Sequence, residues 1–171
     1  PESLMTRKPA SARAAVKTAP KTKTPTTKAS STKADVDGVL PDRDLRALVK
    51  SGAISADAGI LDDQVQPASL DLRLGKVAYR LRASFLPGKR VVADRLDDSL
   101  VMHTLDLTRG AVLETGCVYL VPLQEKLKLP ADLSAAANPK SSTGRIDVFV
   151  RAVSDRARAF DGVPLGYSGE L

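Results

Sequence analysis

The sequence predicts a mostly β fold, a barrel or sandwich of largely antiparallel strands with one short helix near the start of the folded part. Apolar residues recur at every second position in several short stretches, as they do in half-buried strands. Turn-forming pairs such as Pro87-Gly88 and Arg109-Gly110 separate these stretches. The 171 residues suffice for one ordinary domain with a single hydrophobic core.

The helix is predicted to begin at Asp42, which can cap it, and to end at Gly52. Leu45, Leu48 and Val49 lie on one side of this helix and should face the core. Beyond it the apolar period becomes two. Strands are expected at residues 68–74, 76–81, 102–107, 117–123 and 145–153, and around Leu127, where Lys126 and Lys128 should face solvent.

Residues 1–38 are predicted to be a disordered basic tail, and residues 39–171 the folded β domain. The tail has almost no large apolar residues, so it cannot bury enough surface to offset the ordering of its backbone. It holds eight Lys and Arg against three acids, a net charge of +5 out of +6 for the whole chain. A solvated tail is favoured over a basic arm for nucleic acid or a targeting peptide. The nearly neutral remainder gives no sign of a nucleic-acid-binding face.

The inventory of cysteine and histidine excludes several classes of site. The chain has one cysteine, Cys117, and one histidine, His103, so it cannot build a disulfide framework or a Cys/His zinc site by itself. The zinc-dependent nucleobase deaminases are excluded for the same reason. No run of eighteen apolar residues is present. We therefore expect a soluble protein of a reducing compartment, the cytoplasm, with no zinc and no membrane partner.

The segment 139–145, Pro-Lys-Ser-Ser-Thr-Gly-Arg, has the side chains that suit a phosphate chain. Lys140 offers a point charge, Ser141 and Ser142 offer hydroxyls, and Arg145 offers a guanidinium fork. The segment is predicted to be a loop that enters the strand at 145–153. It does not match the Walker A pattern. Taken alone, such a loop is more often an ordinary solvated turn.

Two further motifs accompany this segment. Residues 66–75 read Gln-Pro-Ala-Ser-Leu-Asp-Leu-Arg-Leu-Gly, and residues 160–169 read Phe-Asp-Gly-Val-Pro-Leu-Gly-Tyr-Ser-Gly. In order and rough spacing, the three motifs resemble those of the deoxycytidine triphosphate (dCTP) deaminases, a family of the dUTPase superfamily. The resemblance runs from about Leu40 to the end of the chain and includes Asp42-Arg43-Asp44 at the helix start. The chain looks most similar to the N-terminal part of the longer, two-part members.

This resemblance implies a dUTPase-like distorted β barrel, or β-clip, and usually a homotrimer with sites between subunits or a pseudo-oligomer with a following half. It also implies an enzyme of pyrimidine deoxynucleotide metabolism, a hydrolase that converts dCTP to dUTP and ammonia and so supplies deoxyuridylate for thymidylate synthesis. Water would attack C4 of cytosine without a metal. Mg²⁺ would be bound only through the triphosphate.

The family's functional residues can be placed on this chain position by position. The stretch 155–160 is longer than in compact members, which can shift the last matches. Ser141 and Arg145 match catalytic residues that position water and the base, Lys140 and Ser142 match phosphate ligands, Ser154 and Arg156 fall where base and phosphates are contacted, and Asp161 falls where the sugar is contacted. On physical grounds, Arg145 can stabilise charge that develops on the ring or keep a carboxylate ionised, and Ser141 can orient the water.

The family's general base is a glutamate a few residues beyond the position of Gly169, and this chain ends at Leu171. Glu170 lies about four residues too early, which displaces a side chain by about 13 Å along a strand. Glu170 is therefore expected on the rim or surface. The chain is accordingly expected to be a fragment that is inactive alone or cannot complete its barrel.

Two other functions remain open. The first is dUTP pyrophosphatase activity, alone or combined with deamination, because the superfamily shares the Ser-Ser loop. Arg145 favours the deaminase, whereas Asp161 near Tyr167 is an acid that could activate water for attack on phosphorus. The second is a non-catalytic nucleotide-binding or regulatory module whose tail docks nucleic acid.

For the remaining polar residues, structural roles are favoured. Cys117 lies in an apolar strand and is expected to be a small buried residue rather than a nucleophile. His103 has no partner in the sequence and is expected to be a surface or structural histidine. Asp71 is expected to be structural and to pair with Arg73 or with a neighbouring subunit.

Overall fold

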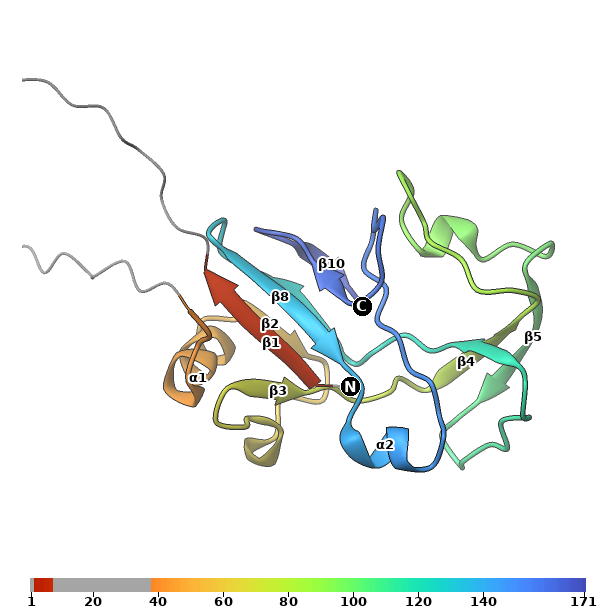
Figure 1. Ribbon diagram of the computed structural model, residues 1–171, viewed down its shortest axis with the longest axis horizontal. Coiled ribbons are helices and arrows are strands. Elements are labelled where there is room, and N and C mark those ends of the chain that lie inside the picture. The colour runs from red at the N-terminus through yellow and green to blue at the C-terminus, as the bar shows by residue number, and fades with distance from the viewer. Residues whose placement is uncertain (1, 8–37) are drawn as a thin grey trace, which may run out of the picture.

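The computed structural model describes residues 2–7 and 38–171 (Figure 1). Helices and strands in this part of the chain are short. In chain order they are β1 (Glu2–Arg7), α1 (Asp42–Lys50), β2 (Ile54–Ala56), the 3-10 turn η1 (Asp62–Gln64), β3 (Ser69–Asp71), β4 (Val77–Leu81), the 3-10 turn η2 (Ala93–Arg95), β5 (Val101–Asp106), β6 (Val118–Leu120), β7 (Glu125–Lys128), β8 (Leu133–Asn138), α2 (Ser141–Arg145), β9 (Gly162–Val163) and β10 (Ser168–Glu170).

Within the described residues the strands form three small antiparallel sheets, ordered β3-β1-β8-β9, β10-β7-β2 and β5-β4-β6. Figure 1 shows β8 beside β1 in the middle of the molecule, with α1 at one end and the β4–β5 pair at the other. The prediction of a mostly β, antiparallel fold with one leading helix is confirmed. The helices of this part of the chain are too short or too polar to cross a bilayer.

Helix α1 follows the predicted pattern. Leu45 is fully buried, and Leu48 and Val49 pack against the same core. The helix N-cap is Pro41 rather than Asp42, and no side chain caps it. Asp42 is the first helical residue, where a negative charge still favours the positive end of the helix dipole. Gly52 adopts a positive φ of 77° just after the helix and donates its N–H to the Val49 carbonyl.

Strand β1 corrects the prediction for the start of the chain. Residues 2–7 are not disordered, because they form a strand that lies between β3 and β8 and pairs with both. Pairing of this kind uses backbone groups, which every non-proline residue carries regardless of its side chain. The rest of the predicted tail, residue 1 and residues 8–37, lies outside the described residues. The domain boundary at residue 39 stays a prediction.

The predicted strands are shorter than expected, and one is wrong. Strands β3 to β7 fall within or close to their predicted ranges. Residues 145–153 form no strand: helix α2 ends at Arg145, and the chain continues without a paired neighbour among the described residues. Their apolar side chains are exposed instead of half-buried, with exposed fractions of 72% for Ile146, 45% for Val148 and 91% for Phe149. The alternating pattern was present, but a strand also needs an adjacent edge with which to pair.

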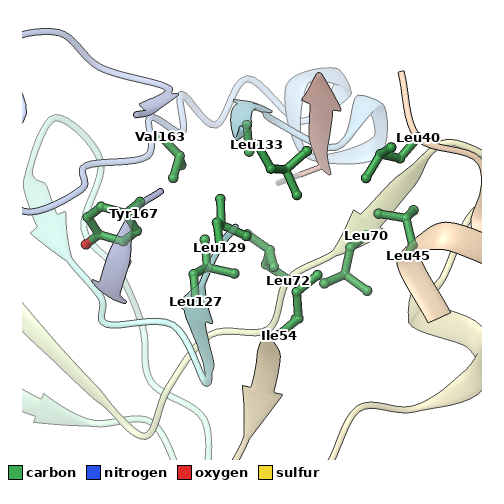
Figure 2. Close-up of a cluster of buried hydrophobic side chains, with 11 residues drawn as sticks. Leu40, Leu45, Ile54, Leu70, Leu72, Leu127, Leu129, Leu133, Val163 and Tyr167 are labelled. Carbon is green, nitrogen blue, oxygen red and sulfur yellow. The ribbon is translucent and has the colours of Figure 1, made fainter. Parts of the chain in front are cut away.

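The hydrophobic core joins the segments that carry the three sequence motifs (Figure 2). Leu70 and Leu72 contribute from the 66–75 motif, and Val163 and Tyr167 contribute from the 160–169 motif. Strand β8 packs Leu133 into the same core and leads directly to the 139–145 segment. Strand β8 contains three consecutive alanines, residues 135–137, and its low β propensity concealed it in the sequence although burial alternates along it. Burial of these side chains therefore fixes the three motifs relative to one another.

A buried charge sits beside this core. Glu125, on β7, is fully buried, and its Oε1 accepts hydrogen bonds from Arg73 Nε and Gln64 Nε2, each at 2.9 Å. Its Oε2 accepts the Arg73 backbone N–H at 2.9 Å. The Arg73 guanidinium also donates to the Gly59 carbonyl at 2.7 Å. Arg73 thus pairs with Glu125, and the predicted pairing of Asp71 with Arg73 is wrong.

Candidate functional site

The 139–145 segment turns out of strand β8 into the single-turn helix α2. Lys140 is the N-cap residue, and its carbonyl accepts the N–H groups of Thr143 and Gly144. The side chains of Ser141, Ser142 and Arg145 are exposed. The segment is therefore a surface helix turn rather than a loop entering a strand. It presents two hydroxyls and a guanidinium to solvent or to a ligand.

An ion pair links this segment to the first motif. The Lys140 ammonium lies 2.5 Å from Asp71 Oδ2, although the two residues are 69 positions apart in the chain. Asp71 is the last residue of β3, and its side chain is 18% exposed, compared with 49% for that of Lys140. Asp71 was predicted to be structural, and its partner in the structure is Lys140.

Ser154 and Arg156 line a hollow of about 640 Å³ on another part of the molecule. The hollow is bounded by the 154–159 stretch and by residues from β9 to the start of β10, including Val163 and Tyr167. Ser154 is buried, and its hydroxyl donates to the Gly162 carbonyl at 2.9 Å. Arg156 has a positive φ of 58° and an exposed side chain. The hollow thus offers an exposed guanidinium beside a serine whose hydroxyl is held by the backbone.

Asp161 links its own segment to residues 151–152 and to strand β8. Its Oδ1 accepts the Ala152 N–H at 2.8 Å, and its Oδ2 lies 2.9 Å from Arg151 Nε. Its carbonyl accepts the Ala137 N–H, which ties the residue to β8. The carboxylate is therefore engaged on both oxygens, and φ at Asp161 is a positive 65°. Within one chain this side chain stabilises the backbone around it.

The predicted site residues thus fall into two groups. Lys140, Ser141, Ser142 and Arg145 lie together on α2 and its N-cap, whereas Ser154 and Arg156 lie in the hollow. None of the α2 residues lines the hollow, and Asp161 is not among its lining residues either. A single copy of the chain does not bring all seven residues around one ligand-sized space.

Similarity to known proteins extends over both groups of predicted site residues. A family model described as the 2'-deoxycytidine 5'-triphosphate deaminase N-terminal domain matches residues 36–171, which include all of these side chains. The chain belongs to the dCTP deaminase family.

Individual relatives agree with this membership. A protein named dCTP deaminase from Natronomonas pharaonis is 32% identical over 137 residues, which are 78% of this chain and 66% of the relative. One named dCTP deaminase, dUMP-forming, from Beutenbergia cavernae is 34% identical over 119 residues, 68% of this chain and 59% of the relative. This chain therefore spans about two thirds or less of the length of these curated relatives.

The solved structure of 2'-deoxycytidine 5'-triphosphate deaminase from Agrobacterium tumefaciens matches the fold with a TM-score of 0.75. It is 57% identical to this chain, and the match covers 78% of this chain and 39% of the solved one. The fold is that of the dUTPase-like proteins, as the motifs implied.

Tyr167, which sequence analysis did not single out as a functional residue, connects the hollow to β10. Its hydroxyl accepts the Asp155 N–H at 3.1 Å and donates to the Glu170 carbonyl at 2.5 Å. Gly169 permits this arrangement, because a Cβ at that position would lie 2.7 Å from the tyrosine hydroxyl. The spacing of a tyrosine between two glycines in the 160–169 motif was the available signal. Burial raises the pKa of Tyr167.

Replacing Tyr167 by phenylalanine in the full-length protein should lower the free energy of unfolding by about 1–2 kcal/mol at neutral pH, because the Asp155 N–H loses its acceptor. Since burial favours the neutral phenol, the stabilisation is complete below the ordinary tyrosine pKa of 10.0 and is lost as the pH rises through the higher folded value. Urea unfolding at neutral and alkaline pH measures both effects. The control is Tyr79→Phe, whose hydroxyl makes no hydrogen bond within the described residues; an equal loss there would contradict the assignment.

Glu170 lies at the surface, as predicted. Its side chain is 65% exposed, and its carboxylate pairs with Lys126 at 3.4 Å. Lys126 also pairs with Asp57 at 3.4 Å, and hydrogen bonds to these two carboxylates raise the pKa of Lys126. On β7, Lys126 and Lys128 flank the buried Leu127, so the prediction of a solvated lysine face is confirmed.

Cys117 and His103 take part in none of these arrangements. His103 is exposed on β5, as predicted. Cys117 is half-buried rather than buried, and its sulfur accepts a hydrogen bond from the Arg80 guanidinium at 3.1 Å. Within the described ranges, no three His, Cys, Asp or Glu side chains gather in a group that could hold a metal ion.

Proposed function

We propose that the full-length protein deaminates dCTP hydrolytically, using the α2 side chains. The observation that carries the proposal is the exposed group of Ser141, Ser142 and Arg145 on one short helix turn, with Lys140 at its N-cap. This group lies in a chain of the dCTP deaminase family. Relatives bearing that name align with it over 119 to 137 residues.

In the proposed reaction, water adds to C4 of the cytosine ring through its oxygen, and the bond from C4 to the exocyclic nitrogen then breaks. The nitrogen leaves as ammonia after gaining a proton, and the ring is left as uracil. The Ser141 hydroxyl can both accept and donate, so it orients the attacking water. The permanent charge of Arg145 stabilises negative charge that develops during the addition.

The phosphates need cations and donors, and Lys140 and Ser142 supply them beside the catalytic pair. Mg²⁺ would arrive with the substrate and would reduce the negative charge of its phosphates. We assign it no protein ligands. Arg156 in the hollow is a second guanidinium for the base or phosphates, and Ser154 retains an acceptor lone pair after donating to Gly162.

The division of the residues into two groups supports a site between copies of the chain. Phe149, Ile146 and Val148 follow α2 and are exposed to 91%, 72% and 45%. Exposed large apolar residues next to a polar group are typical of a surface that another protein covers. In a trimer, as we propose, this surface packs on a second copy, and α2 of one copy faces the hollow of another.

A second function remains open on a specific observation. Several relatives, including those from Beutenbergia cavernae and Dictyoglomus thermophilum, are named dCTP deaminase, dUMP-forming. Formation of dUMP from dCTP requires the loss of pyrophosphate as well as deamination. In this chain, Asp161 is the acid of the 160–169 motif that could activate water for attack on phosphorus. Both of its carboxylate oxygens are engaged, by Ala152 and Arg151. We therefore favour deamination with dUTP as product over a bifunctional reaction or pyrophosphatase activity alone, and over a non-catalytic nucleotide-binding module.

The test is to incubate the full-length protein separately with dCTP and dUTP and to measure ammonia and pyrophosphate. Ammonia without pyrophosphate from dCTP is the expected result. Ammonia with an equal amount of pyrophosphate from dCTP would show that the product is dUMP rather than dUTP. Pyrophosphate from dUTP without ammonia from dCTP would overturn the deaminase assignment. Binding of dCTP without either product would identify a non-catalytic module.

A further inference from the structure

The carboxylate of Asp71 lies in an unusual environment. Its side chain is 18% exposed, and its Oδ1 is buried without a hydrogen-bond partner in the described part of the chain. Its Oδ2 accepts the short hydrogen bond from Lys140. A carboxylate with one buried and unsatisfied oxygen is costly to keep ionised without a close cation. The Lys140 ammonium is such a cation.

The position of Asp71 is fixed by the strand that carries it. Leu70 and Leu72 on either side are both buried in the core. The Asp71 carbonyl accepts a hydrogen bond from Gln64 Nε2 at 2.8 Å, and Gln64 is itself held by the buried Glu125. Because these contacts set the backbone of Asp71, its carboxylate cannot move far from the N-cap of α2.

Lys140 is held by Asp71 and is about half exposed. Its side chain is 49% exposed, so the ammonium contacts Asp71 while part of it still faces solvent. A lysine has several rotatable bonds, and a ligand that binds a free lysine must pay for ordering them. The exposed part of the side chain is accessible to a second anion, such as a phosphate.

We propose that Asp71 is a positioning residue that holds the Lys140 ammonium, and with it the start of α2, in place for the phosphates of the nucleotide. The inference deepens the proposed function and rests on it. Asp71 would act by preorganisation, because the ion pair orders the lysine side chain before the nucleotide binds. If Asp71 acted only by repelling phosphate, removing its charge would strengthen nucleotide binding. If Asp71 orders Lys140, removing its charge should weaken nucleotide binding, so the change in affinity distinguishes the two roles.

The test compares Asp71→Asn, Lys140→Gln and the double variant in the full-length protein. Asp71→Asn should raise the KM for dCTP by about tenfold, the effect of one charge-assisted hydrogen bond, while kcat changes by less than about threefold. Combined with Lys140→Gln, it should add almost nothing, because both changes disable the same ammonium. Binding of deoxycytidine, which has no phosphate, should not change. The matched control is Asp57→Asn, which removes an exposed carboxylate paired with Lys126 and should leave the KM unaltered.

Several results would overturn the inference. These are a lower or unchanged KM for dCTP in Asp71→Asn, additive effects in the double variant, or equal losses for dCTP and deoxycytidine. The last result would mark Asp71 as a purely structural residue. If Asp71→Asn does not fold, Asp71→Ala, which leaves no buried polar side chain, is measured in the same way.

Calorimetric titration with dCTP separates this inference from the proposed reaction. A wild-type protein that binds dCTP but releases no ammonia would contradict the reaction, and the dissociation constants of the variants would still test Asp71. A wild-type protein that deaminates dCTP, with none of the expected change in Asp71→Asn, would contradict the inference alone.

Discussion

The Arg145→Ala variant of the full-length protein is expected to lose at least about a hundredfold in kcat/KM for dCTP while keeping its fold. Removing a group that stabilises charge in the transition state typically costs two to three orders of magnitude. The guanidinium is exposed at the end of α2, and in the described part of the chain it forms no ion pair. Its removal should therefore leave stability nearly unchanged.

Steady-state ammonia release measures this effect, and thermal unfolding checks the fold. Arg145→Lys keeps a positive charge but not the planar fork, so it should recover only a small part of the lost activity. The matched control is Arg109→Ala, which removes another exposed arginine, from a turn that carries none of the motifs. Unchanged turnover in Arg145→Ala would show that the site has been assigned to the wrong residues.

The largest effect on stability is expected from Glu125→Ala, with a loss of about 3–5 kcal/mol in the free energy of unfolding. The fully buried carboxylate accepts three hydrogen bonds, from the side chain and backbone of Arg73 and from Gln64. Its removal leaves a guanidinium and an amide without their acceptor in a region that excludes water. Such a loss is a large part of the stability of an ordinary domain.

Urea unfolding of the wild-type and variant proteins measures this loss. Glu125→Gln should cost less, because an amide oxygen in the place of Oε1 still accepts the hydrogen bonds of Arg73 Nε and Gln64 Nε2. The control is Glu114→Ala, which breaks the surface ion pair with Arg80, where the glutamate side chain is 59% exposed, and should cost about 1 kcal/mol or less. A loss in Glu125→Ala no larger than in this control would mean that the buried cluster contributes little net stability.

Two kinds of information could be obtained from the sequence. Periodicity identified α1 and placed strands β3 to β7, because spacing reports directly which side of an element is buried. The three motifs identified the family and its fold, which the family model and the solved structure then confirmed. The solvated lysines on β7 followed from the same alternation, and the exposed position of Glu170 followed from its offset from the family's glutamate.

The partner of each polar group was decided only by the tertiary structure. Asp71 meets Lys140, 69 positions away, and Arg73 meets Glu125, 52 positions away. Ser154 and Asp161 bind backbone groups within one chain, and the predicted strand at 145–153 found no edge to pair with in the described residues. Local pattern shows which residues tend to be buried, whereas the partner of a charge or a strand edge depends on which distant segments the core brings together. The sequence alone therefore determined the family, the helix and most strands, and folding determined how the site residues are held.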